Sequence, residues 1–131
     1  MNATDWAALV QTLKNPTDVD AAVVAAQRLH REATKEDLPR LRELLADSSF
    51  FVREAAVWPL SELAGASAVP ELFEAYQRGL DEGHDNDGFS AALIEMAEAD
   101  PDNVRRVLTD LAQSGDPATR ENAAWLLEFC G

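Results

Sequence analysis

The chain has 131 residues, of which 47% are hydrophobic, so it is long enough to bury the core of one compact domain. Its 24 acidic and 11 basic residues give a formal net charge of −13, which disfavours binding to nucleic acid or to anionic membranes and favours a basic partner. No apolar run could span a bilayer, the first residues lack the pattern of a secretory signal, and a single cysteine excludes an internal disulfide framework. We therefore expect a cytoplasmic protein.

Helix-forming patterns run along the whole chain and place eight helices at residues 4–14, 18–32, 35–46, 49–64, 67–80, 86–99, 102–113 and 117–129. In the first, Trp6, Leu9 and Leu13 stand at positions i, i+3 and i+7, so they form one apolar stripe toward the core. Asp116 marks the start of the last helix, because it is an N-cap former followed by a proline. Pro59 lies inside the fourth helix, where we expect it to kink the helix or to remove a hydrogen bond.

The helices recur as four pairs. Each second helix repeats an N-cap former, a small apolar residue and a large apolar residue, at Asp18, Ala25 and Leu29; Ser49, Ala56 and Leu60; Asp85, Ala92 and Met96; and Asp116, Ala123 and Leu127. These positions divide a single domain of residues 1–131 into repeats at about 4–33, 34–65, 66–100 and 101–131. A period of this length without strands predicts an all-α fold, a short α-solenoid of four antiparallel helix pairs.

Three segments resemble known repeats: Phe51–Ala56, Ala68–Leu72 and Asp116–Ala124. They are similar to HEAT repeats, and are closest to the HEAT-like subclass named after phycobiliprotein lyases. The resemblance implies a right-handed stack of helices used for protein contacts, and it carries no shared catalytic residues.

Two tryptophans are candidates for partner binding. Trp58 and Trp125 each follow the small apolar residue of their repeat by two positions, about 200° around the helix, and so point away from the alanine-lined seam. In HEAT-like proteins the second helices line the concave surface, which would form a strip of Gln27, Trp58, Ile94 and Trp125. Exposed tryptophans commonly anchor interfaces, although both rings could instead pack between helices. Trp6 is expected in the core.

Acidic residues are concentrated in the third repeat. Between Glu71 and Asp102 lie ten acids and one base, which account for nine of the thirteen net negative charges. The turn at residues 79–88 is the longest in the chain, and Asp85 is expected to cap the helix that follows it. The candidate partner-binding acids are Asp81, Glu82, Asp85, Asp87, Glu95 and Glu98. The alternative is that these charges only keep the protein soluble.

Cofactor and metal chemistry find little support in the sequence, and no cofactor is expected. The turn at 79–88 does not fit the calcium-binding EF-hand pattern, so only a weak cation site is left open there. His30 and His84 lie in different repeats, which argues against a zinc site and against histidine-based catalysis. Arg53 is expected to pair with Asp47 as a structural contact, and Cys130 to be a small buried hydrophobe.

These features favour a protein without enzymatic activity that binds a basic protein partner. The most concrete form of this hypothesis is a bacterial immunity or inhibitor protein that neutralises a toxin domain and binds neither nucleic acid nor membrane. The sequence leaves the oligomeric state open, and a monomer is favoured. One alternative is a general adaptor or assembly scaffold. Another is a HEAT-like enzyme, such as a bilin lyase or an alkyl-base DNA glycosylase, but a glycosylase needs a basic cleft, which the net charge disfavours.

Overall fold

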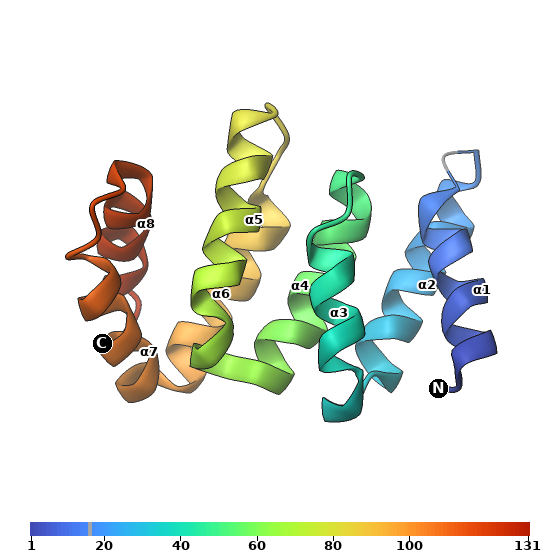
Figure 1. The fold of residues 1–131 in the computed structure, drawn as a ribbon, viewed down its shortest axis with the longest axis horizontal. Coiled ribbons are helices and arrows are strands. Elements are labelled where there is room, and N and C mark those ends of the chain that lie inside the picture. Colours follow the sequence, from blue (N-terminus) through green and yellow to red (C-terminus); the bar gives the residue numbers. More distant parts are fainter. Residues whose placement is uncertain (16) are drawn as a thin grey trace. The chain divides into compact units, whose positions relative to one another are not determined.

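The computed structural model describes residues 1–15 and 17–131, and none of these residues lies in a strand. They form eight α-helices (Figure 1): α1 Ala3–Lys14, α2 Val19–Glu32, α3 Leu38–Leu45, α4 Phe50–Ala64, α5 Val69–Asp81, α6 Asp87–Ala99, α7 Pro101–Leu111 and α8 Pro117–Leu127. Two 3-10 turns, η1 Lys35–Asp37 and η2 Gly65–Ala68, precede α3 and α5. The predicted all-α, solenoid-like fold is confirmed.

The chain divides into two compact units, unit 1 at Met1–Leu63 and unit 2 at Ala64–Gly131. The division falls at the end of the second predicted repeat, so each unit contains two of the predicted helix pairs. That residues 1–131 behave as a single domain stays a prediction.

Unit 1 is held together by two stacked helix pairs. Trp6 of α1 is only 8% exposed, which confirms its predicted place in the core, and Leu29 of α2 is completely buried in the same unit. The second pair, α3 and α4, buries Leu41 and Leu60 completely. An ion pair of 3.1 Å between Lys14 Nζ and the carboxylate of Asp47 links the first pair to the second.

The N-terminus of unit 1 is fixed by a cluster around Arg40. Its guanidinium lies 4.2 Å from the centre of the Trp6 ring, forms an ion pair with Asp37, and donates a hydrogen bond of 3.3 Å to the carbonyl of Met1. The carboxylate of Asp37 also accepts a 2.8 Å bond from the backbone N–H of Thr34 and so closes a capping box. Burial raises the pKa of Asp37, but the bond from Thr34 and the charge of Arg40 outweigh it and hold this pKa below its ordinary value.

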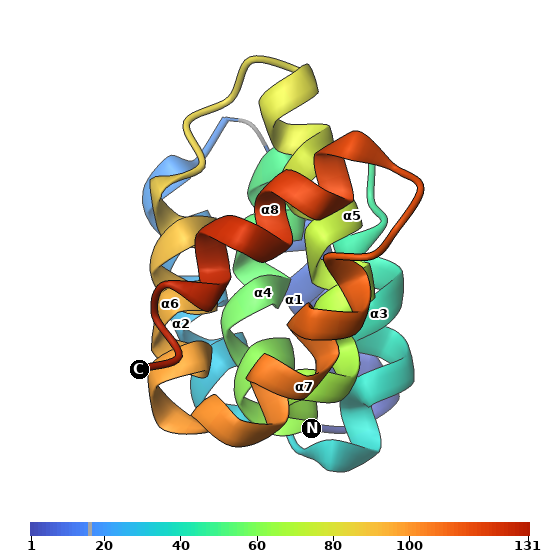
Figure 2. The same cartoon turned by 90° about the vertical axis from the view of Figure 1, so that its left-hand side faces the viewer.

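Unit 2 repeats the arrangement with α5 to α8. The helix α5 contacts both α7 and α8, and α6 contacts α8, so the second pair stacks on the first (Figure 2). The core of the unit contains five completely buried side chains, Leu72, Phe89, Leu93, Leu108 and Leu126. Large side chains at helical spacing on one face explain why these segments fold as amphipathic helices.

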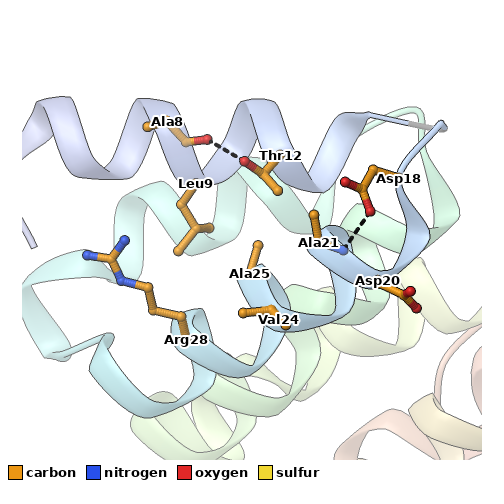
Figure 3. A pocket seen from close by; sticks show the side chains of 9 residues that line it. All are labelled: Ala8, Leu9, Thr12, Asp18, Asp20, Ala21, Val24, Ala25 and Arg28. Carbon is orange, nitrogen blue, oxygen red and sulfur yellow. Dashed lines mark hydrogen bonds between the residues drawn. The ribbon is translucent and has the colours of Figure 1, made fainter.

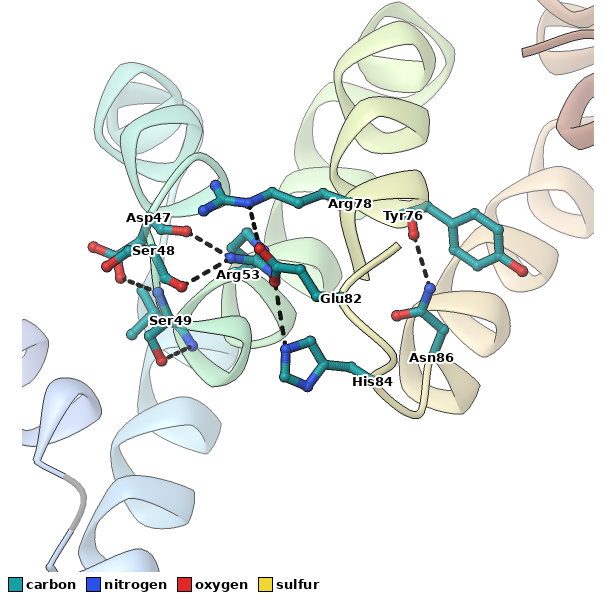
Figure 4. A network of polar contacts seen from close by, with 10 residues as sticks. Asp47, Ser48, Ser49, Arg53, Tyr76, Arg78, Glu82, His84 and Asn86 are labelled. Atoms are coloured by element: carbon teal, nitrogen blue, oxygen red, sulfur yellow. Dashed lines mark hydrogen bonds and ion pairs between the residues drawn. The ribbon is translucent and has the colours of Figure 1, made fainter. Parts of the chain in front are cut away.

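The start of α6 differs from the prediction by one residue, and the N-cap is Asn86 rather than Asp85. The carboxylate of Asp85 accepts a 3.0 Å hydrogen bond from the N–H of Asp87 within the turn. Asn86 is 7% exposed, its Nδ2 donates a 2.8 Å bond to the carbonyl of Tyr76, and its Oδ1 lies against Gly79 (Figure 4). Anchoring this amide on α5 fixes where α6 begins.

Pro59 does not interrupt α4, which runs as one helix from Phe50 to Ala64 with the proline ring buried. Proline has no N–H to donate, so the helix tolerates one missing backbone bond at this position. Val57 and Leu60 on the same helix are completely inaccessible to solvent, and their burial stabilises the helix against that loss.

Candidate functional site

A histidine, a glutamate and a tryptophan meet between α2 and α4 in unit 1. Nε2 of His30 lies 2.8 Å from Oε1 of Glu62, and the rings of His30 and Trp58 have centroids 5.9 Å apart with planes inclined by 36°. The side chains of His30 and Glu62 are 41% and 53% exposed, and Trp58 is half-buried. This cluster therefore offers a hydrogen-bonded ionisable pair and an aromatic surface to a molecule from solution.

The repeat architecture explains why these three side chains come together. Trp58 and Glu62 are four residues apart on α4 and so share one face of that helix. Leu29 and Leu60 are equivalent in their repeats and are both completely buried, which fixes the rotation of α2 and α4. His30 follows the first leucine directly and therefore lies beside the exposed face of α4.

An imidazole paired with a carboxylate can accept or donate a proton and can also stabilise positive charge. When His30 is neutral and donates Nε2–H to Glu62, its Nδ1 is available as a general base. The carboxylate of Glu62 provides negative charge beside the same position, and the face of the Trp58 ring attracts cations. The arrangement is suited to a reaction in which a cationic group is bound and a water molecule loses a proton.

Sequence reasoning missed this pair, because His30 was considered without the residues of the next repeat. Glu62 follows it by 32 residues, which is close to one repeat length, so the two lie in neighbouring second helices. A search for ionisable residues one repeat apart, next to the large apolar position, would have brought the two together.

Trp125, the counterpart of Trp58 in unit 2, belongs to an aromatic cluster. Its ring is stacked on Tyr76 of α5, with centroids 5.6 Å apart and planes inclined by 7°, and Phe129 meets it edge-on at 5.8 Å. The ring is half-buried. Gln27 and Trp58 lie in unit 1 but Ile94 and Trp125 in unit 2, so the continuous strip of four residues stays a prediction.

The six acids proposed for partner binding, Asp81, Glu82, Asp85, Asp87, Glu95 and Glu98, are all exposed in unit 2. Glu82 accepts from Arg78 at 3.1 Å and lies 3.4 Å from Nε2 of His84 (Figure 4). Within residues 1–15 and 17–131, no three His, Cys, Asp or Glu side chains are grouped so that they could hold a metal ion. A binding role for the six acids stays a prediction.

Two arginines in equivalent positions fasten the turns before their helices. Arg53 is completely buried, and its Nη1 donates to the carbonyls of Asp47 at 2.9 Å and Ser48 at 3.1 Å (Figure 4). Likewise, Nη1 of Arg120 donates a 2.8 Å hydrogen bond to the carbonyl of Ser114, which lies six residues earlier. Asp47 is thus a partner of Arg53, as predicted. Arg53 contacts its backbone carbonyl, and this contact is structural.

The carboxylate of Asp47 has other bonding partners. It accepts a 2.9 Å hydrogen bond from the backbone N–H of Ser49 in addition to its ion pair with Lys14. Burial raises the pKa of Asp47, but the bond from Ser49 and the charge of Lys14 outweigh it and hold this pKa below its ordinary value. Asp47 therefore contributes to the stability of unit 1 in its ionised form.

The single thiol is buried, which confirms the prediction for Cys130. It is 1% exposed, and burial raises the pKa of the thiol. Only a thiolate is a good nucleophile, so this side chain is unsuited to accept a group from a substrate. In the part of the chain that the structure describes, no helix has the length and apolar character needed to cross a membrane.

Comparison with known proteins gives one finding. Residues 3–127 match the family model described as DNA alkylation repair enzyme. No curated protein and no solved structure is found to match the chain.

This match contradicts the functional hypothesis drawn from the sequence. It indicates an enzyme with a DNA substrate, whereas the sequence favoured a protein without enzymatic activity, an immunity or inhibitor protein that binds a basic toxin domain and no nucleic acid. The error came from extending the charge of the acidic third repeat to the rest of the chain. Unit 1 has 7 bases and 10 acids, a net charge of −3, whereas unit 2 has 4 bases and 14 acids, a net charge of −10.

Proposed function

Because the chain belongs to the family of DNA alkylation repair enzymes, we propose that it removes alkylated bases from DNA by hydrolysing the bond between base and deoxyribose. This is the DNA glycosylase alternative from the sequence. The observation that carries the proposal is the cluster of His30, Glu62 and Trp58 on α2 and α4, which combines a base, an anion and an aromatic face.

Trp58 is proposed to bind the damaged base. Alkylation of a ring nitrogen leaves a purine with a positive charge, and a cationic ring is attracted to the face of a tryptophan. Undamaged bases are neutral and lack this attraction. An enzyme that acts on a base takes it out of the stacked duplex, and a half-exposed aromatic ring compensates for the lost stacking.

The hydrolysis follows from the charges of substrate and cluster. As the C1′–N bond breaks, its electron pair moves to the cationic base, which departs neutral and needs no protonation by an acid. Positive charge develops on the deoxyribose, and the carboxylate of Glu62 stabilises it. Water then attacks C1′, and Nδ1 of His30 accepts the proton that this water loses before passing it to solvent. One imidazole and one carboxylate therefore suffice for the reaction.

The charges around the cluster are compatible with DNA. The segment 28–42, which contains His30, has five bases and three acids, a net charge of +2 in an acidic chain. Arg31, the neighbour of His30, is 70% exposed and can reach a phosphate. DNA is proposed to approach this segment of unit 1, since the acids of unit 2 repel its backbone.

Direct transfer of the alkyl group to the protein is the competing chemistry. It requires an accessible thiolate, whereas the thiol of Cys130 is 1% exposed and its pKa is raised. Hydrolysis uses side chains that solvent reaches, and it is the reaction that we propose.

The test uses duplex oligonucleotides that carry one N7-methylguanine or one N3-methyladenine. Release of the free base and formation of an abasic site are measured over time with the purified chain, at low and at moderate salt. We expect release above the spontaneous rate, and a matched duplex with the unmodified base should release none. If the wild-type chain releases neither base faster than buffer alone, the proposal is wrong.

Two finer expectations from the sequence are kept as proposals. One is that, among HEAT-like proteins, the repeats resemble the subclass named after phycobiliprotein lyases. The other is a cytoplasmic location. Fractionation of the source cells, with the protein detected by antibody, would test the location.

A further inference from the structure

A groove of about 560 Å³ lies between α1 and α2 of unit 1 (Figure 3). Leu9, Val24 and Ala25 form its apolar part. Asp20 lies near one end of the groove and Arg28 near the other, both on α2. The groove takes no part in the cluster of His30, Glu62 and Trp58.

Helix α2, which forms one side of the groove, carries exposed apolar side chains. Val19, Val23 and Val24 are 66%, 40% and 63% exposed, and all three lie on α2. Of these three valines, Val24 lines the groove. An apolar side chain that is 63% exposed beside a groove indicates a surface that another protein covers.

The charges of this surface are complementary to themselves. Asp20 precedes Val24 by four residues and Arg28 follows it by four, so each lies about 6 Å from Val24 along the helix axis. If a twofold axis passes beside Val24, α2 of a second copy runs antiparallel to α2 of the first. Each Asp20 then lies opposite Arg28 of the other copy, and the Val24 side chains of the two copies meet between these pairs.

We propose that a second copy of this chain occupies the groove and that the protein forms a twofold dimer through α1 and α2. Arg28 Nε already holds Glu32 at 2.8 Å, which orients the guanidinium and leaves its other N–H groups for the partner carboxylate. The sequence favours a monomer, and the mass measurement described below decides between monomer and dimer. The inference does not depend on the proposed function, because His30 follows Val24 by six residues, about 240° around α2, and stays accessible in the dimer.

The first test measures the mass of the purified chain in solution over a range of concentrations by sedimentation equilibrium. We expect a dimer that dissociates on dilution. Val24→Glu places a charge at the centre of the contact and should raise the dissociation constant at least about tenfold. Leu80→Glu is the matched control, because Leu80 is a 45% exposed apolar side chain of α5 outside the groove, and it should change nothing.

The second test exchanges the charges. Asp20→Arg alone and Arg28→Asp alone each place like charges opposite one another, and each should weaken the dimer about tenfold or more. Mixing the two variants should restore association, since one copy then carries two bases and the other two acids. Circular dichroism confirms that each variant is folded. A monomer at every concentration, or a dimer that is insensitive to Val24→Glu and to both charge exchanges, would overturn the proposal.

Discussion

Trp58 and Trp125 hold the same position in their repeats, one in unit 1 and one in unit 2, but their neighbours differ. Trp58 lies beside His30, which is hydrogen-bonded to Glu62, whereas Trp125 is stacked on Tyr76 and meets Phe129. One register position thus supports an ionisable cluster in unit 1 and an aromatic packing cluster in unit 2. The role of each tryptophan depends on the helix packed beside it, because the repeat fixes only the position of the tryptophan on its own helix.

The largest effect is expected from removing the ionisable pair. His30→Ala and Glu62→Gln should each lower the rate of base release by about 10²–10⁴-fold, the usual contribution of a positioned base or anion. The rate is measured in single-turnover reactions with the N7-methylguanine duplex, and thermal unfolding establishes that each variant is folded.

Unit 2 offers a matched pair as the control. His84 lies 3.4 Å from Glu82 on the surface, so His84→Ala removes a second histidine–glutamate contact away from the proposed site. Its rate should equal that of the wild type. An equal loss in His84→Ala and His30→Ala would contradict the assignment of chemistry to unit 1.

The next effect separates the two tryptophans. Trp58→Ala should weaken binding to alkylated DNA by about 1–3 kcal/mol, as removal of a base-stacking ring does, with a small change in stability. Trp125→Ala should instead lower the free energy of unfolding by about 2–3 kcal/mol and leave DNA binding unchanged, since its ring packs against two others. DNA binding is followed by fluorescence anisotropy and stability by urea unfolding. The comparison fails if both variants lose the same property.

A smaller effect is expected on the stability of the protein in acid, to which the buried carboxylate of Asp37 in unit 1 contributes. The pKa of Asp37 is held below the ordinary 3.8, so its ionised form stabilises the folded state. This contribution is complete above pH 3.8 and is lost as the pH falls through the lower folded-state pKa. Asp37→Asn should cost about 1 kcal/mol at neutral pH, and it should flatten the dependence of unfolding free energy on pH in the acid range. Urea unfolding at several pH values measures this, and an unchanged dependence would contradict the role of Asp37.

The smallest effect is expected from long-range charge. Asp87→Asn, Glu95→Gln and Glu98→Gln together remove three exposed negative charges from unit 2 and should raise DNA affinity a few-fold at low salt only. Arg31→Ala in unit 1 should weaken binding and reduce the slope of log affinity against log salt by about 1. Affinities that respond to the unit 2 changes alone would place the DNA contact elsewhere.

Much of the fold could be predicted because helix boundaries are local. The segment predicted as a helix at 18–32 is α2 at Val19–Glu32, and 117–129 contains α8 at Pro117–Leu127. The segment 35–46 divides into η1 and α3, since the capping box of Thr34 and Asp37 tightens the first turn and Pro39 lies in the first turn of α3, where a proline is tolerated. Caps, prolines and apolar spacing act within a few residues and are visible in a sequence.

The candidate site could not be predicted in the same way. His30 and Glu62 meet only after α2 and α4 stack, and the sequence indicates which residues face the core without placing the exposed neighbours. Net charge was equally uninformative, because a total of −13 conceals the segment 28–42 with its net charge of +2. Local electrostatics depends on which residues the fold gathers, so the total charge and the acidic third repeat together pointed to the wrong class of partner.

The contact between Gly79 and Asn86 has a consequence for which sequences of this protein can evolve. Replacing a glycine inside a helix such as α5 by alanine normally stabilises the helix by about 1 kcal/mol. Here a Cβ at Gly79 would collide with the amide of Asn86, whose Nδ2 is bonded to the carbonyl of Tyr76. Two positions seven residues apart are therefore expected to vary together: a lineage that replaces Gly79 must first lose Asn86, and with it the anchor of the turn before α6.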